Sequence, residues 1–274
     1  MCLIIFAFQT HPRYKLVLAA NRDEYYHRPT APAEWWQEAR FLLAGKDLEA
    51  GGTWMGITKN GKLAALTNYR GTDSHKKNAP SRGALVSQYL LSNISSREYL
   101  EELQAKSPEY NGFNLILGDM DKLRYYSSRQ NKILPIAPGV HGLSNDSLDT
   151  PWPKVVKGKQ ILEQQVLSQP GISLAPIFSF LEDTEMAPDH QLPDTGIGIE
   201  YERVLSSIFI KSPEYGTRSS TVLLVDKDNR VTFAERCFAP PSEKKYRFRI
   251  ELTPRRGDPL CCANRLCRFS FVTG

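Results

Sequence analysis

The order in which strand-like and helix-like segments follow one another is the feature that most constrains this chain. Paired apolar runs fill residues 1–68, helical periodicity follows from about residue 81, strands return at 113–127, and a helical region covers 153–181. Three further strands close the body of the chain. Strands and helices therefore come in groups, which favours antiparallel sheets with helices outside them. We predict an α+β protein with two stacked antiparallel sheets, flanked by helices on both outer faces.

Two pairs of apolar runs predict β-hairpins in the first part of the chain. The expected strands are Cys2–Phe8 with Tyr14–Ala20, and Thr53–Ile57 with Leu63–Thr67. The turn of the second pair contains Asn60-Gly61, a dipeptide that suits the positive φ of a tight turn. Between the hairpins lies a stretch with Pro29, Pro32 and Trp35-Trp36. We predict it to be a long irregular loop, and loops of this length are usually functional or cover a ligand.

The remaining elements follow from periodicity and capping residues. We expect a helix around residues 85–90 with Ser81 as its N-cap, because Leu85, Val86, Tyr89 and Leu90 share one face. Pro153 opens the strongest helical pattern of the chain. The other expected helices are residues 96–106, 153–167 and 174–181, and the other expected strands are residues 113–118, 123–127, 221–225, 230–236 and 246–250.

Composition places the chain among ordinary globular proteins. Of its 274 residues, 41% are hydrophobic and 24% are charged, and no apolar run approaches the ~20 residues that cross a bilayer. No basic segment precedes the opening apolar run, so we expect a cytoplasmic protein without a membrane span. Four arginines and one aspartate in residues 252–274 supply three of the five net positive charges. The rest of the chain is nearly neutral, which argues against a nucleic-acid partner.

Residues 252–274 also differ from the rest in cysteine content. They hold three of the five cysteines, in a spacing that does not match a zinc site. Only Cys2 and Cys237 remain, too few for a disulfide framework. We therefore predict one domain over residues 1–251 and a tail of unclear origin after it, and we expect no metal site.

Cys2 is the first candidate for chemistry. A small side chain after the initiator methionine permits removal of Met1, which would make Cys2 the first residue. Its α-amine, with a pKa of roughly 7.7–8.0, could then act as the base for its own thiol. The alternative is that Cys2 is a small buried hydrophobic residue at the start of an apolar strand.

Polar residues stand where several apolar strands end. Asn21-Arg22-Asp23-Glu24 follows the second strand, and the hairpin returns this segment to the neighbourhood of Cys2. Asp23 could orient the amine of Cys2, while Arg22 could hold a substrate anion. Asn68, Asn145 and Arg218 occupy similar boundaries and could donate to an oxyanion or clamp a carboxylate. Taken individually, each of these three matches an ordinary turn or cap residue, since Asn and Ser favour such places.

Taken together, these segments resemble one family. The resemblance covers residues 1–251, and nothing after residue 252 is similar to it. The chain resembles the NRDE family, also called the Transport and Golgi organisation protein 2 family. That family is similar to N-terminal-nucleophile hydrolases such as bile-salt and penicillin V acylases, which have an αββα sandwich and cleave amides with an N-terminal cysteine. The segments that carry the resemblance are Met1-Cys2, Asn21-Arg22-Asp23-Glu24, Thr67-Asn68-Tyr69-Arg70 and Tyr215-Gly216-Thr217-Arg218-Ser219-Ser220.

The resemblance implies a role for each matching position. Cys2 would be nucleophile and base, Asp23 would hold its amine, and Arg218 would order the site. Asn68 and Asn145 would donate to the oxyanion. The remaining motif residues, implied to bind substrate, are Asn21, Arg22, Glu24 and Arg70.

The chain departs from the acylases at one position of this pattern. The acylases carry an arginine directly before the asparagine that follows the second strand. In this chain that asparagine is Asn21, and the residue before it is Ala20. Arg22 comes two residues later and is expected to occupy a different place, because adjacent strand residues point to opposite faces.

Two functions of different classes follow from these observations. The first is a hydrolase that cleaves an amide or an acyl thioester with Cys2 and needs no cofactor. The second is a non-catalytic carrier on the same sandwich, since the family has been implicated in haem trafficking and in acyl-CoA and lipid metabolism. The expected partner is accordingly a small acyl compound or haem. Under a third interpretation, the motifs only pack strand ends.

Overall fold

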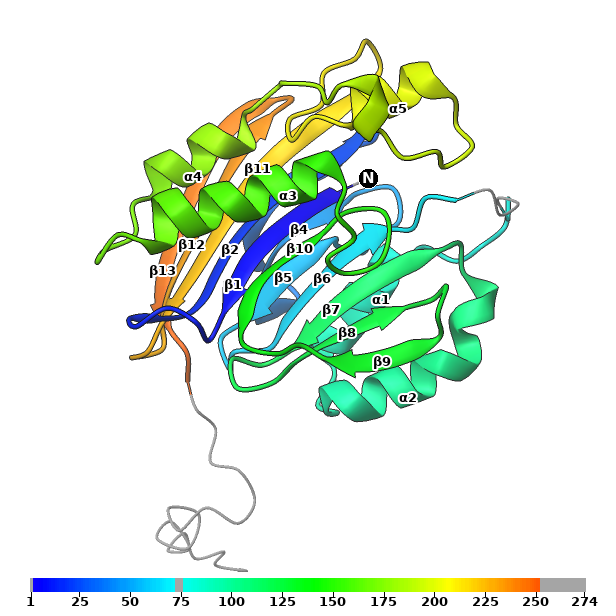
Figure 1. Ribbon diagram of the computed structural model, residues 1–274. Coiled ribbons are helices and arrows are strands. Elements are labelled where there is room, and N and C mark those ends of the chain that lie inside the picture. The colour runs from blue at the N-terminus through cyan, green and yellow to red at the C-terminus, as the bar shows by residue number, and fades with distance from the viewer. Residues whose placement is uncertain (1, 72–75, 252–274) are drawn as a thin grey trace, which may run out of the picture.

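The computed structural model describes residues 2–71 and 76–251, and these form two antiparallel sheets stacked face to face (Figure 1). The first sheet has the strand order β10-β1-β2-β11-β12-β13. Its strands are β1 (Cys2–Phe8), β2 (Tyr14–Tyr25), β10 (Gly139–Leu143), β11 (Tyr215–Asp226), β12 (Arg230–Phe238) and β13 (Pro241–Arg249). All of its pairings are antiparallel, as predicted.

The second sheet runs in sequence order from β3 to β9, again with antiparallel pairing throughout. Its strands are β3 (Thr30–Trp36), β4 (Ala39–Asp47), β5 (Met55–Thr58), β6 (Leu63–Asn68), β7 (Phe113–Gly118), β8 (Leu123–Ser127) and β9 (Lys132–Pro135). Because each strand follows its neighbour along the chain, short connections suffice for most of this sheet.

Helices cover the outer face of each sheet, which gives four layers (Figure 1). The helices are α1 (Gly83–Leu91) and α2 (Ser96–Lys106) on the second sheet, and α3 (Pro153–Ile161), its π-helical continuation Leu162–Leu167, and α4 (Leu174–Leu181) on the first. A short α5 (Ile199–Leu205) precedes β11. In the described part of the chain, no helix has the length and apolar character that crossing a bilayer requires.

Three hydrophobic cores lie between these layers, and they explain the unbroken apolar run of β1. Ile4 and Phe6 belong to the core between the sheets. Leu3 and Ile5 belong to the core beneath α3 and α4. A strand buried on both faces is apolar at every position, as observed. The α+β sandwich predicted from the element order is therefore confirmed.

The stretch between the first two hairpins was predicted to be irregular, and this prediction is wrong. It folds into the hairpin of β3 and β4. Pro32 of β3 is tolerated because β3 is an edge strand of its sheet, where a missing backbone donor breaks no ladder. Strands β9 and β10 and helix α5 were also not expected.

Helix α1 differs from the prediction at its start. Arg82 occupies the N-cap position, and no side chain caps the helix, so Ser81 is not the cap. By contrast, α2 spans the predicted residues, and the Ser95 side chain accepts a hydrogen bond from the Glu98 amide. The hydroxyl at that cap explains why the start of α2 could be read from the sequence.

Candidate active site

The first hairpin brings the opening cysteine beside the polar end of β2. Cys2 lies opposite Arg22 in the register of β1 and β2. On the other side of β2, Thr217 of β11 pairs with Asp23, and Ser219 pairs with Arg22. A register shift between Thr217 and Ser219 leaves Arg218 at a bulge. Three segments far apart in sequence thus meet at one end of the first sheet.

The Cys2 side chain is half-buried and lies on the face of β1 that carries Ile4 and Phe6, toward the second sheet. It borders a cavity of about 10 Å³, room for about one water molecule. The cavity is lined by Cys2, Ile4, Ala20, Asn21, Arg22, Trp54, Met55, Leu66 and Thr221. Desolvation by the surrounding protein raises the pKa of the Cys2 thiol, and the charge of Asp23 acts in the same direction, whereas the charge of Arg22 opposes this shift.

Asp23 is buried, with 1% of its surface exposed. Its Oδ1 accepts a 2.7 Å hydrogen bond from the Thr217 hydroxyl. Desolvation raises the pKa of this carboxyl, whereas nearby Lys154 and Arg22 and the Thr217 bond act in the opposite direction. A buried carboxylate therefore stands next to Cys2 with cations on two sides.

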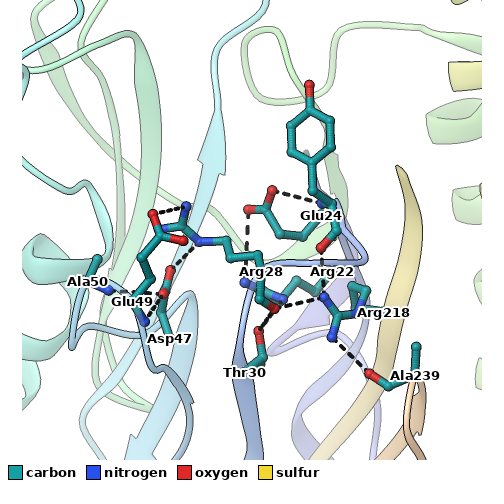
Figure 2. Close-up of polar contacts among 10 residues, drawn as sticks. Arg22, Glu24, Arg28, Thr30, Asp47, Glu49, Ala50, Arg218 and Ala239 are labelled. Carbon is teal, nitrogen blue, oxygen red and sulfur yellow. Dashed lines mark hydrogen bonds and ion pairs between the residues drawn. The ribbon is translucent and has the colours of Figure 1, made fainter. Parts of the chain in front are cut away.

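Arg22 lies on the same face of β2 as Ala20, so the alternation of strand faces does not separate these two positions. The reason is that residues two apart on a strand share a face. Its guanidinium stacks 4.2 Å from the ring centre of Trp54 and donates to the Thr30 hydroxyl. Glu24 lies 3.9 Å from it (Figure 2). Arg22 thus presents its charge to the same small cavity as Cys2.

Asn21 faces the other way, toward the helices that cover the first sheet. Its Nδ2 donates to the carbonyls of Leu181 and Ile208, both at 2.8 Å. Its Oδ1 accepts from the Ser220 hydroxyl at 2.6 Å. Both hydrogens of Nδ2 are therefore occupied inside the protein, which argues against the substrate contact predicted for Asn21.

The two predicted oxyanion donors are joined to each other. Asn145 Nδ2 donates to the Asn68 carbonyl at 2.8 Å. The neighbouring Ser144 hydroxyl donates to the Cys2 carbonyl at 3.4 Å. Asn145 in turn accepts from Arg70, through its backbone carbonyl at 2.6 Å and through Oδ1 at 3.5 Å. The end of β6 and the loop after β10 are thereby tied to the start of β1.

Arg218 does not face an open site, because its guanidinium binds backbone carbonyls (Figure 2). It donates to Tyr25 at 2.7 Å, to Arg28 at 3.0 Å and to Ala239 at 2.8 Å. Tyr25 is the last residue of β2, Arg28 lies in the turn after it, and Ala239 lies in the connection between β12 and β13. The arrangement agrees with an ordering role for Arg218 and argues against a clamp on a substrate carboxylate.

Comparison with known proteins supplies the family. The profile described as Transport and Golgi organisation 2 matches residues 1–240. The Transport and Golgi organization protein 2 homolog of Bos taurus is 43% identical over 256 residues, covering 86% of this chain and 92% of that protein. The human homolog is 40% identical with the same coverage. The chain belongs to the Transport and Golgi organisation 2 family.

Two solved structures are similar to this family member at low identity. One is a Caenorhabditis elegans N-acylethanolamine-hydrolyzing acid amidase ortholog, with a TM-score of 0.49, 10% identity, and coverage of 81% of this chain and 92% of that one. The other is a mutant conjugated bile acid hydrolase from Clostridium perfringens, with a TM-score of 0.41, 11% identity, and coverage of 93% and 100%. The four-layer sandwich itself rests on the strand pairing and the cores described above.

Four residues of this region were not among the site residues expected from the sequence, although Tyr215 belongs to a quoted motif. They are Arg82, Lys154, Glu202 and Tyr215. The charge of Cys2 acts on Arg82, Lys154 and Tyr215. Glu202 forms a buried ion pair with Arg70 at 2.7 Å. Tyr215 carried a signal as the first residue of a quoted motif, and Lys154 carried one because a cation in the first turn of a helix opposes the helix dipole.

Residues that could hold a metal do not gather in the described ranges, 2–71 and 76–251, where no three His, Cys, Asp or Glu side chains form a cluster. Cys2 and Cys237, the cysteines within those ranges, are both free. The chemistry that this arrangement offers is therefore that of a thiol beside a buried carboxylate and several cations.

Proposed function

We propose that this chain is an N-terminal-nucleophile hydrolase that cleaves an amide or an acyl thioester with Cys2. One observation carries the proposal. Cys2 begins a central strand opposite Arg22, and the next residue of the partner strand, Asp23, holds a buried carboxylate whose charge acts on the Cys2 thiol. The thiol of Cys2, the position of its α-amine and the carboxyl group of Asp23 therefore lie at the same end of the first sheet.

The thiol needs a base in this environment. Because desolvation raises the pKa of Cys2, the sulfur carries its proton at neutral pH. After removal of Met1, the α-amine of Cys2 would accept that proton. The sulfur would then form a bond to the substrate carbonyl carbon, and the C=O electron pair would move onto oxygen.

Collapse of this intermediate regenerates the carbonyl and breaks the C–N or C–S bond. The ammonium of Cys2 would return its proton to the leaving nitrogen or sulfur, which leaves an acyl thioester on Cys2. A water molecule then gives a proton to the same amine as its oxygen bonds to the acyl carbon. The Cys2 sulfur departs and recovers the proton, so the cycle closes with a free acid and an unchanged enzyme.

Other residues of the site fit supporting roles in this cycle. The Asn68 side chain stands at the end of β6 and would donate to the oxyanion. Asn145 uses one Nδ2 hydrogen on the Asn68 carbonyl, so it would hold Asn68 in place and could offer its second hydrogen. Arg22, beside the cavity of Cys2, would attract an anionic substrate group.

A cytoplasmic location of the protein stays a prediction.

A carrier is the second candidate. Its support comes from the relatives, whose names refer to transport and Golgi organisation. A cavity of about 10 Å³ next to Cys2 also gives no preformed room for an acyl group. Under this proposal the chain would bind an acyl compound or haem without covalent chemistry at Cys2.

Substitution of Cys2 separates the two candidates. A chain lacking Met1 should hydrolyse a short acyl thioester or acyl anilide, and Cys2→Ala should reduce kcat/KM at least about 100-fold. Cys237→Ala, which removes the other half-buried cysteine, is the matched control and should retain the wild-type rate. Equal rates for wild type and Cys2→Ala would contradict catalysis by Cys2, and full activity with Met1 attached would contradict the α-amine as the base. Absence of hydrolysis from the wild-type chain, with ligand binding retained, would leave the carrier.

A further inference from the structure

The guanidinium of Arg22 is held firmly at one edge and only loosely at another. The side chain is buried, and it lines the same small cavity as Cys2. Its Nη1 donates to the Thr30 hydroxyl at 3.2 Å. Its Nη2 lies 3.9 Å from Glu24 Oε2, which is beyond hydrogen-bond distance (Figure 2). A guanidinium offers several N–H donors, so the bond to Thr30 leaves most of them for other partners.

Two contacts fix the orientation of this guanidinium. Its Cζ lies 4.2 Å from the ring centre of Trp54, as in a cation–π contact. Gly45 of β4 makes room for that indole, because a Cβ at this position would lie 2.2 Å from the ring. Thr30 is fixed in turn, since its hydroxyl donates at 3.3 Å to the Arg28 carbonyl, which also accepts from Arg218 at 3.0 Å. A guanidinium that is oriented before binding loses less freedom when it binds a carboxylate through two parallel bonds.

Glu24 is the carboxylate at the loosely held edge of Arg22. Its side chain is half-buried, and its Oε1 accepts from the Tyr25 amide at 2.9 Å. Glu24 therefore holds its charge near Arg22 without a direct hydrogen bond to it. An ion pair at such a distance contributes little, whereas a bidentate pair of arginine and carboxylate combines two charge-assisted hydrogen bonds. A carboxylate that replaces Glu24 at this edge would bind Arg22 more strongly.

We propose that Arg22, oriented by Thr30, is the subsite for a substrate carboxylate, and that this carboxylate displaces Glu24 as an internal anion. The inference rests on the proposed hydrolase function and narrows its substrates to acyl compounds with a carboxylate close to the scissile carbonyl. The closeness follows from the register, in which Arg22 lies opposite Cys2 on the adjacent strand. The carboxylate can belong to the acyl group or to the leaving group, and the test distinguishes these sources. Thr30 is a positioning residue, because it acts through Arg22.

The test uses paired substrates in which a carboxylate replaces a methyl group. Succinyl anilide and butyryl anilide differ in the acyl group, whereas butyrylglycine and N-ethylbutyramide differ in the leaving group. The measured quantity is the ratio of kcat/KM for the charged and the neutral member of each pair, with the full chain beginning at Cys2. In one of the two pairs, Thr30→Val should lower this ratio about 10-fold, through KM and not through kcat. Glu24→Gln should raise the same ratio about 3-fold, because the internal anion is removed.

Matched variants assign these effects to the Thr30 hydroxyl and the Glu24 charge. Thr30→Ser keeps the hydroxyl and should preserve the ratio, and Thr30→Ala takes the place of Thr30→Val if the valine variant fails to fold. Thr232→Val, at another half-buried strand threonine, should leave the ratio unchanged. Glu49→Gln removes the exposed carboxylate of a neighbouring arginine pair and should also leave it unchanged (Figure 2). The proposal is overturned if Thr30→Val leaves the ratio of both pairs unchanged, or if Glu24→Gln lowers it.

Calorimetric titration separates this inference from the hydrolase. Cys2→Ala, which lacks the nucleophile, is titrated with the same four compounds. The charged member of one pair should bind more tightly than its neutral partner, and adding Thr30→Val should weaken its binding about 10-fold. This result, together with a wild-type chain that hydrolyses none of the four, would contradict the hydrolase and retain the subsite. Equal binding of charged and neutral members, together with hydrolysis by the wild type, would contradict the subsite alone.

Discussion

At the scale of single residues, the sequence indicated where polar groups gather but only partly what they bind. Arg22 and Asp23 could be placed beside Cys2 because the turn of a hairpin fixes which residues of its two strands lie opposite each other. The three carbonyls bound by Arg218 could not be predicted, since they come from the end of β2, from the turn after it and from residue 239. Lys154 was missed because a buried charge is recognisable only with its partners in view.

The buried pair of Arg70 and Glu202 gives a prediction at this scale. The side chains are 7% and 3% exposed, and Arg70 also stacks 4.8 Å from the ring centre of Trp152. Glu202→Gln should lower the free energy of unfolding by about 3 kcal/mol, because it leaves the guanidinium buried without its anion. Urea unfolding measures this loss.

A control and a second variant sharpen this prediction. Glu101→Gln, which breaks the exposed pair with Arg97, should leave the urea midpoint unchanged. Adding Arg70→Met to Glu202→Gln should recover part of the lost stability, since the unpaired charge is then removed. A double variant that is less stable by the sum of both single losses would contradict the pairing argument.

At the scale of elements, strands with continuous apolar runs were predictable, whereas the edge strands β3 and β9 were not. Strands β1 and β7 are buried along nearly their whole length and appear in the sequence as continuous apolar runs. The edge strands β3 and β9 carry prolines and exposed positions, which are typical of edges that must not pair with another chain. The local sequence pattern of these two segments therefore indicates a loop, although pairing with a neighbouring strand makes each of them a strand.

The contact between β10 and α3 predicts a pH dependence of stability. His141 and Lys159 bind Asp149 at 2.7 and 2.6 Å. The bond to Asp149 raises the pKa of His141. Burial alone would raise the pKa of Asp149, but hydrogen bonds from His141 and Lys159 outweigh it and bring the pKa to about 2.

The directions of the pKa shifts of Asp149 and His141 define the pH range in which this contact stabilises the fold. A lowered carboxyl pKa stabilises the fold above about pH 4, and this contribution is lost as the pH falls toward 2. A raised histidine pKa stabilises it below about pH 6.5, and this contribution is lost as the pH rises through the native value. Asp149→Asn should therefore cost more stability at pH 5 than at pH 9, as measured by urea unfolding. Asp228→Asn, at an exposed pair, should show no such difference.

At the scale of the whole molecule, the order of strands and helices was enough to predict the layers, but it did not predict which strands pair with each other. Grouped strands and helices implied two sheets with helices outside, and the three cores fill the spaces between those layers. The pairing of β2 with β11 joins segments about 190 positions apart, with no local signal. That pairing places Thr217 on Asp23, so the candidate site depends on the part of the topology that sequence pattern does not reveal.

The last described residues predict where the folded domain ends. The Ile250 amide donates to Asn229 in the first sheet's β11–β12 turn, and the Glu251 amide donates to Lys59 in the second sheet's β5–β6 turn. The Ile250 side chain is buried in the core between the sheets. A chain ending at Glu251 should therefore unfold at the same urea midpoint as the full chain, as expected for one domain over residues 1–251.

A chain that ends at Arg249 provides the comparison. It loses two backbone hydrogen bonds and one buried isoleucine, which should cost roughly 3–5 kcal/mol of unfolding free energy. Urea unfolding of the three chains side by side measures both effects. If ending at Glu251 were as costly as ending at Arg249, the domain would need residues beyond 251; if neither cut mattered, the closure of the two sheets would not depend on Ile250.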